Sequence, residues 1–309
     1  MSTPQHLEFD ASPSVLKAYS KMLLPRGGSE VTTLPELSAT LRNHLPNYGD
    51  VRAYEEICGL PYALGSQAQR LPLIYPQILA APLHMQLMSH PDFPLHAAGL
   101  IHVRNTITRH LPLPLYERLD IEARIGESRQ VDAGLEFDIL TMARDQDDQL
   151  LWEATTTILQ KRSSSSKSSD EGKSKKRERV PFASSVAHPD VSTILRVPAS
   201  QGRRYAAVCK DYNPIHLHPL TAKLFGFPRA IAHGMWVLGR SIGELVDLFP
   251  IDAKEDPCTL EVAFKRPVLL PSRILLTART LSNDCLDIAV TTTDGAIPHL
   301  TASLAPSDP

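Results

Sequence analysis

Two stretches in the first half of the chain return in the second half at nearly the same spacing, and this internal repeat constrains the fold most. Residues 52–60 (RAYEEICGL) align with residues 203–211 (RRYAAVCKD), sharing an arginine, a tyrosine, an aliphatic residue and a cysteine in register at an offset of 151. Residues 120–124 (DIEAR) parallel residues 275–279 (LLTAR) at an offset of 155. A near-constant offset indicates a duplicated domain. Two copies also agree with a length of 309 residues, which is about twice that of a typical single core.

The composition changes abruptly between the two copies. Residues 161–179 (KRSSSSKSSDEGKSKKRER) hold seven serines, eight basic and three acidic residues, and no apolar side chain. Because this segment has nothing to bury, we expect a disordered linker between an N-terminal domain at residues 1–160 and a C-terminal domain at residues 180–309. Basic tracts of this kind also serve in nuclear import or nucleic-acid binding, but they are common in linkers. The tract carries a net charge of +5, so the chain's total of −2 leaves −7 for the rest. An acidic body binds phosphate backbones poorly, and no nucleic-acid partner is expected.

Each half has the same order of predicted elements, with helices first and alternating strands after them. The expected helices are residues 54–58 and 76–88 in the first half, and 203–208 and 230–246 in the second. The expected strands are residues 100–108, 119–126, 135–142 and 151–159, then 259–265, 274–280, 286–292 and 299–304. A long apolar helix followed by an antiparallel meander must be wrapped by that sheet, which predicts an α+β fold. Two such halves can join their sheets edge to edge, which hides exposed strand edges.

The sequence gives no sign of a membrane span, a signal peptide or a metal centre. No run reaches the roughly 18 to 20 uninterrupted apolar residues of a membrane helix, and the N-terminal sequence MSTPQHLE lacks a basic start followed by an apolar segment. We therefore expect a cytoplasmic location and no membrane partner. The four cysteines are scattered without a C-x-x-C pair, so we expect them to be reduced, with no metal site among them.

The residues that carry chemistry begin with an acid and a histidine in the second half. Asp211 and His216 are five residues apart, and on a continuous helix they would point about 140° apart. Asn213 and Pro214 stand between them and prevent that helix, because a residue before proline favours extended geometry and Asn-Pro favours a turn. The chain can then fold back and aim both side chains into one pocket. A carboxylate and an imidazole held together can move protons between a substrate and water.

A second feature follows seventeen residues after His216. The run 230–235 (AIAHGM) opens an apolar helix, and Gly234 near its N-terminus offers a backbone N–H that no side chain obstructs. Such a donor suits a carbonyl oxygen that gains negative charge during a reaction.

Together these motifs resemble the signature of the MaoC-like (R)-specific enoyl-CoA hydratases and 3-hydroxyacyl-thioester dehydratases. The similar parts are residues 211–216 (DYNPIH), Ala222, residues 231–235 (IAHGM) and the strand entry at 264–268 (FKRPV). The resemblance implies the hotdog fold, here a double hotdog in which an antiparallel sheet wraps a central helix in each half, with the motif in only one half. It also implies reversible hydration of trans-2-enoyl thioesters to (R)-3-hydroxyacyl thioesters, an acyl-CoA or acyl-carrier substrate, and no cofactor.

The resemblance implies a role for each matching residue. Asp211 would be the base on the water, His216 its partner in proton delivery, and Asn213 the residue that holds the turn. The Gly234 amide would polarise the thioester carbonyl. Ser241 falls where some relatives place a serine near the site, although packing within the helix is an equal alternative.

The other two histidines of this region are interpreted as structural. His218 is expected in a loop and His233 at the packed start of a helix, in a supporting role. Neither is expected to bind metal, because no carboxylate or cysteine stands at metal-ligand spacing from either one in the sequence.

Three departures qualify the resemblance. Lys210 precedes Asp211 where the family usually has glycine, and it can either lower the proton affinity of the carboxylate or point into solvent. The N-terminal copy has Leu60 and Gly65 at the positions of Asp211 and His216, so that half is expected to be catalytically inactive and to supply an acyl-chain tunnel instead. Residues 92–96 (DFPLH) imitate the motif with the wrong spacing and are interpreted as a loop.

Two alternatives to the hydratase stay open at this point. One is a non-catalytic hotdog protein that binds acyl thioesters, and the other is a hotdog thioesterase, which would direct water to the carbonyl carbon. A homodimer is a further expectation. Acyl-chain length, the thioester carrier and the direction of the reaction are not determined by the sequence.

Overall fold

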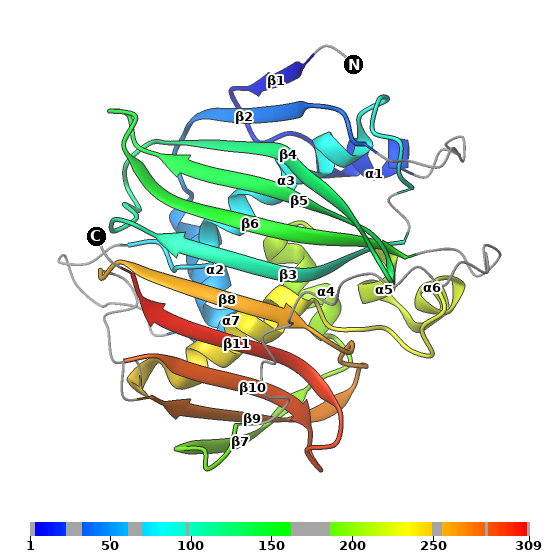
Figure 1. Ribbon diagram of the computed structural model, residues 1–309, viewed down its shortest axis with the longest axis vertical. Helices are drawn as coiled ribbons and strands as arrows, with labels where there is room; N and C mark the ends of the chain where they lie inside the picture. The colour runs from blue at the N-terminus through cyan, green and yellow to red at the C-terminus, as the bar shows by residue number, and fades with distance from the viewer. Residues whose placement is uncertain are drawn as a thin grey trace.

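A computed structural model describes residues 4–22, 33–60, 70–96, 99–161, 186–248, 255–281 and 284–307. The strands of both halves form one eleven-stranded sheet in the order β1-β2-β4-β5-β6-β3-β8-β11-β10-β9-β7, and the long helices lie behind this sheet in Figure 1. The first half contributes β1 (Gln5–Phe9), α1 (Val15–Met22), β2 (Leu37–His44), α2 (Tyr48–Cys58), α3 (Tyr75–Ser89), β3 (Leu100–Arg109), β4 (Leu119–Val131), β5 (Gly134–Arg144) and β6 (Leu150–Lys161).

The second half repeats this plan with shorter strands. It contributes β7 (Val191–Val197), α4 (Gln201–Cys209), α5 (Pro214–Leu217), α6 (Pro219–Leu224), α7 (Gly234–Leu245), a 3-10 turn (Val246–Leu248), β8 (Cys258–Phe264), β9 (Ser272–Thr280), β10 (Leu286–Thr292) and β11 (Pro298–Pro306). The α+β prediction is confirmed, with a helix of each half on one face of a mostly antiparallel sheet.

The two halves join edge to edge through β3 and β8, as the strand pattern predicted (Figure 1). Outward from this seam the order is β3-β6-β5-β4-β2 on one side and β8-β11-β10-β9-β7 on the other, so equivalent strands occupy equivalent places. Thr108 and Thr259, which are 151 residues apart, face each other across the seam with their hydroxyl oxygens 3.2 Å apart. The internal repeat is therefore visible in the tertiary structure.

Helices α2 and α7 also hold the halves together. The indole Nε1 of Trp236 donates to the carbonyl of Ile57 at 3.0 Å. A Cβ on Gly243 would lie 2.3 Å from the carbonyl oxygen of Cys58, so only glycine permits this approach of helix to backbone.

All eight predicted strands are present, but the structure adds elements that the pattern did not indicate. Strand β4 continues five residues beyond the predicted end through a polar stretch, because β5 supplies partners for it. The N-terminal β1, β2 and α1, and the edge strand β7, were missed because they are short and only partly apolar.

One predicted helix begins later than expected. The pattern placed its start at residue 230, but Ala230 and Ala232 instead make backbone hydrogen bonds with Leu270 and Val268, and α7 begins at Gly234. The expected linker at 161–179 lies outside the described residues except for Lys161, which ends β6. Within the described ranges, no helix combines the length and apolar character needed to cross a membrane.

Candidate active site

The segment that leads to the site begins where α4 ends at Cys209. Lys210 forms the C-cap in the left-handed region with φ of 59°, a conformation that glycine adopts without steric cost. Its ammonium turns back and donates to the carbonyl of Ala207 at 2.8 Å. Lys210 therefore takes the structural place of a C-cap glycine, and its charge is held at the C-terminal end of α4, where the helix dipole favours a cation.

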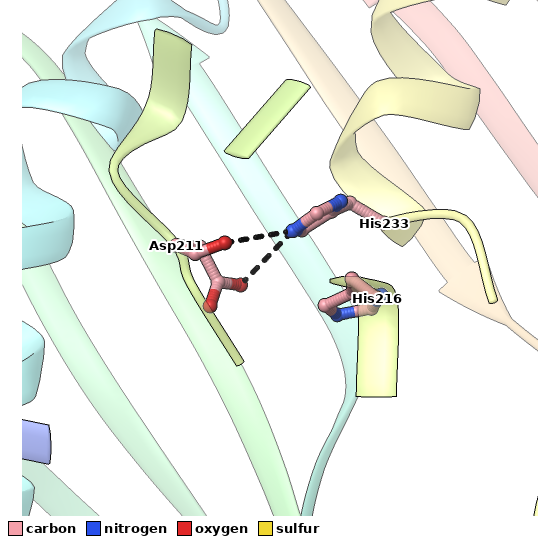
Figure 2. A group of neighbouring side chains, drawn as sticks. All are labelled: Asp211, His216 and His233. Carbon is pink, nitrogen blue, oxygen red and sulfur yellow. Dashed lines mark hydrogen bonds and ion pairs between the residues drawn. The ribbon is translucent and has the colours of Figure 1, made fainter. Parts of the chain in front are cut away.

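The turn that the sequence predicted between Asp211 and His216 is present. Asn213 is the N-cap of α5, its side chain accepts from the N–H of Ile215 at 3.4 Å, and Pro214 is the first helical residue. Asp211 lies before this short helix and His216 lies within it, so the two side chains do not share one continuous helix. Figure 2 shows them approaching each other from these separate segments.

His216 is buried, and its hydrogen bond defines its tautomer. Nδ1 lies 2.8 Å from the carbonyl oxygen of Ile231, and because a carbonyl only accepts, Nδ1 carries the proton and Nε2 keeps a lone pair. Burial lowers the pKa of His216, against the opposing effect of the Asp211 charge. The backbone of His216 also packs closely against α4 at Gly202. A Cβ added to Gly202 would lie only 1.9 Å from the carbonyl oxygen of His216.

His233 belongs to the same cluster, which spacing in the sequence did not reveal. Its ring stacks on that of His216 with centroids 3.6 Å apart, and its Nε2 donates to the main-chain carbonyl of Asp211 at 3.1 Å and lies 3.7 Å from Asp211 Oδ2 (Figure 2). Burial lowers the pKa of His233 to about 3, so the ring is neutral at physiological pH. His233 is the buried N-cap of α7, and spacing along the chain gave no sign of Asp211 beside it because folding brings together groups 22 residues apart.

The carboxylate of Asp211 has two differently occupied oxygens. Oδ1 accepts from the N–H of Asn213 at 3.1 Å and from the hydroxyl of Tyr19, whereas Oδ2 faces His233. Burial alone would raise the pKa of this carboxyl, but His233, His216 and the two donors outweigh burial and lower the pKa below its ordinary value. Asp211 is thus an anion at neutral pH, with its side chain 40% exposed.

Gly234, the expected oxyanion donor, stands at the N-terminal end of α7. It is the first residue of α7, directly after His233, so its N–H has no acceptor within the helix. A Cβ at this position would lie 2.8 Å from the ring of Phe264, and glycine is therefore required by packing. Ser241 is different, because its buried hydroxyl donates to the carbonyl of Val237 within α7 at 2.8 Å, which is a packing contact.

The three side chains could also be considered as a metal site. One ligand atom from each of Asp211, His216 and His233 lies within 4.8 Å of the others. However, His216 Nδ1 and His233 Nε2 each contact a main-chain carbonyl as donors, and a metal ligand nitrogen must be unprotonated. A metal ion bound through either of these two nitrogens would have to displace its hydrogen bond to the main chain.

Two residues of the first half reach the site without any signal in the sequence. One is Tyr19 in α1. The other is His102 in β3, whose ring packs edge-on against Phe264 with centroids 4.9 Å apart. Burial lowers the pKa of His102 to about 4, although the Asp211 charge acts in the opposite direction. Their positions follow from the packing of the two halves, which a linear pattern does not encode.

Three other positions singled out from the sequence, Leu60, Asp92 and His218, make contacts of their own. Leu60 packs against the hydrophobic core, and Gly65 falls outside the described residues. Asp92 follows α3 in a loop, as predicted, and its carboxylate accepts from the side chain of Gln5. His218 caps α6, where its Nδ1 accepts from the N–H of Leu220 at 3.1 Å.

Comparison with known proteins places this geometry in context. The family model described as "MaoC like domain" matches residues 176–297. The 3-hydroxyacyl-thioester dehydratase X of Mycobacterium tuberculosis is 32% identical over 271 residues, covering 88% of this chain and 90% of that protein. The enoyl-CoA hydratase ChsH3 of the same organism is 27% identical over 195 residues, covering 60% of this chain and 65% of its own.

Solved structures agree with these sequence relationships. The crystal structure of HtdX of Mycobacterium tuberculosis superposes with a TM-score of 0.70 at 30% identity, covering 87% of this chain and all of that one. A conserved hypothetical protein of the same organism, described as having a double hotdog fold, superposes with a TM-score of 0.52 at 11% identity, covering 90% of this chain and 97% of that one. The fold predicted from the resemblance, a double hotdog, is confirmed.

Proposed function

The chain belongs to the MaoC-like dehydratase family, and from that premise we propose that it adds water reversibly to trans-2-enoyl thioesters, forming (R)-3-hydroxyacyl thioesters. It is thus a carbon–oxygen lyase of the hydratase/dehydratase type. The observation that carries the proposal is the meeting of Asp211 and His216 beside the N-terminal end of α7. This arrangement supplies an acid/base pair and an oxyanion donor, which are the groups that this reaction requires.

In the proposed reaction one water molecule is held between Asp211 and His216. The ligand atoms of Asp211, His216 and His233 lie within 4.8 Å of one another, and a water that bridges two acceptors at ordinary hydrogen-bond lengths spans about 4.5 Å. In the proposed hydration, the water oxygen bonds to C3 of the enoyl group while one of its protons passes to Asp211. The π electrons move onto the thioester carbonyl as an enolate, which the Gly234 N–H stabilises.

The proton then returns to the substrate through His216. In the observed tautomer Nε2 carries no proton, so His216 receives the proton of Asp211 before it delivers it to C2. Delivery to C2 restores the carbonyl and completes the addition of H and OH. Burial lowers the pKa of His216, which favours release of this proton. The stacked His233 holds the Asp211 main chain in place through its own hydrogen bond.

Incubation with crotonyl-CoA tests the proposal. Loss of the enoyl absorbance with the thioester intact indicates hydration, free thiol indicates a thioesterase, and saturable binding without either change indicates a binding protein. Asp211→Asn and His216→Ala are each expected to lower kcat by roughly 10²- to 10⁴-fold without unfolding the protein. Retention of near-full activity by either variant would contradict the roles assigned here.

The chain offers a matched control for these variants. Asp92→Asn alters an acid in the sequence DFPLH, which imitates the active motif but lies in a loop after α3. Its carboxylate contacts Gln5 and lies 4.0 Å from His90 Nδ1. Both residues belong to the first half of the fold, so the rate is expected to stay within about twofold of wild type.

Two further properties stay predictions from the sequence, a cytoplasmic location and a homodimeric assembly. Localisation of the tagged protein and size-exclusion chromatography test them. The thioester carrier, which the sequence leaves open, is identified by comparing CoA with carrier-protein substrates. The acyl tunnel expected in the first half would lie beside α3. The buried side of that helix includes the polar residues Gln77 and His84, which are hydrogen-bonded to Thr156 and Thr141. Rates over a series of enoyl-chain lengths test that tunnel.

A further inference from the structure

Tyr19 brings the first half of the chain into contact with the catalytic carboxylate of the second half. Its hydroxyl donates to Asp211 Oδ1, although the two residues are 192 positions apart. Tyr19 lies on α1, which packs against α3, and the neighbouring residue Ala18 is fully buried. The start of α1 is also attached to α3, because Gln86 donates to the carbonyl of Ser14 at 3.3 Å. The position of the Tyr19 hydroxyl is therefore set by a packed helix rather than by a loose terminus.

The contact distinguishes the two oxygens of Asp211. Oδ1 already accepts from the N–H of Asn213 at 3.1 Å, and the Tyr19 hydroxyl is a second donor to the same atom. Oδ2 instead lies 3.7 Å from His233 Nε2, beyond hydrogen-bonding distance. With Oδ1 occupied by two donors, Oδ2 is the oxygen with free acceptor capacity for a water molecule.

From this geometry we propose that Tyr19 is a positioning residue for the hydration reaction, which fixes the rotation of the Asp211 carboxylate and makes Oδ2 the base. The proposal rests on the proposed function. It also changes the role of the first half, which contributes a side chain to the chemistry even though it carries no copy of the Asp/His motif.

The chemistry of the pair supports a permanent donor–acceptor relationship. Burial, and next the charge of Asp211, raise the pKa of Tyr19 far above its ordinary value, so the phenol keeps its proton and always donates. A hydrogen bond to the charged form of a carboxyl favours ionisation, and Tyr19 is one of the groups that lower the pKa of Asp211. Tyr19 therefore keeps Asp211 unprotonated and ready to accept a proton from water.

A blocking role is the competing interpretation of the same contact. If the phenol occupied the place of the catalytic water, it would have to leave before each reaction, and its removal would speed turnover. Both Asn213 and Tyr19 donate to Oδ1, so the oxygen that acts as the base is Oδ2. Tyr19 then does not occupy the place of the water, which favours the positioning role over the blocking role.

Tyr19→Phe tests the proposal by removing a single oxygen atom. We expect kcat with crotonyl-CoA to fall roughly tenfold with little change in KM, since one hydrogen bond to a charged group is lost. We also expect the acid limb of the kcat/KM profile to move up by about one pH unit, because Asp211 loses a donor. A residue that only packs α1 would not shift this profile.

The control variant is Tyr116→Phe, at an exposed tyrosine of the first half that stacks on Tyr48. It should leave both kcat and the pH profile unchanged. An unchanged or faster Tyr19→Phe enzyme with an unshifted acid limb would overturn the positioning role, and a faster one would establish the blocking role.

A second measurement does not depend on activity. In urea unfolding at pH 7, Tyr19→Phe and Asp211→Asn should show coupling in a double-mutant cycle, whereas Tyr116→Phe and Asp211→Asn should be additive. A wild-type protein inactive on every enoyl thioester would refute the proposed function, but coupling would still demonstrate the contact. Additivity of Tyr19→Phe with Asp211→Asn would refute the contact itself.

Discussion

Substitution of Gly202 by alanine tests whether the placement of His216 limits the rate. Gly202 is the second residue of α4, and an added Cβ would lie 1.9 Å from the carbonyl oxygen of His216. Real Cβ atoms essentially never come closer than 3.0 Å to another atom, so α5 or α4 must move by at least about 1.1 Å. A misplacement of about 1 Å in an active site can cost on the order of 10²-fold in rate, or about 2.7 kcal/mol of transition-state stabilisation.

The assay is the rate of crotonyl-CoA hydration, measured with circular dichroism and thermal unfolding on the same preparations. Alanine is favoured over glycine in a helix by about 1 kcal/mol, so a loss of rate would not come from weakening of α4 itself. The matched control is Gly49→Ala, because Gly49 is also the second residue of a helix, α2, and its added Cβ meets only Asn47 Oδ1, at 3.1 Å.

We expect Gly49→Ala to keep the wild-type rate while Gly202→Ala loses about 10²-fold with the fold retained. A folded Gly202→Ala enzyme with the wild-type rate would refute the reasoning. It would mean that α5 moves freely without consequence, and that His216 is not held at a rate-determining position.

Two further predictions concern stability. Lys210→Gly relieves a left-handed conformation and should raise the free energy of unfolding by about 0.5 to 1 kcal/mol in urea titration; a decrease would mean that the Nζ bond to Ala207 outweighs this strain. Burial lowers the pKa of His84 to about 3, of His102 to about 4 and of His233 to about 3. These rings therefore stay neutral in the folded protein at pH 5 to 7. In the unfolded chain they take up protons below the ordinary histidine pKa of ~6.5. Stability should therefore fall as the pH drops from ~6.5, by on the order of 2 kcal/mol for each ring at pH ~5, and an unfolding free energy that is constant between pH 7 and 5 would contradict the burial of these rings.

Much of the architecture followed from the sequence because its signals are local or periodic. The offset of about 150 residues predicted two related halves, and alternating apolar residues located eight strands that the structure contains. The turn between Asp211 and His216 was also predictable, because Asn213 caps and Pro214 starts a helix through contacts with their immediate neighbours. These are preferences of short segments, and folding did not overrule them.

The exact start of one helix and the presence of the short outer strands were less predictable from the sequence. The helix expected from residue 230 begins at Gly234, because residues 230–232 pair with a distant extended segment. Strand β7 and the N-terminal β1 and β2 exist because neighbouring strands offer hydrogen-bond partners, and their own sequences are too short or too polar to indicate this.

The composition of the active site was decided by the tertiary structure. The sequence identified Asp211, His216 and Gly234, which lie within one stretch of the second half. It did not indicate that His233 stacks on His216, or that Tyr19 from the opposite end of the chain donates to Asp211. These contacts depend on how α1 packs on α3 and how the halves meet at β3 and β8, and side chains that meet through packing leave no spacing rule in the sequence because their separation along the chain is arbitrary.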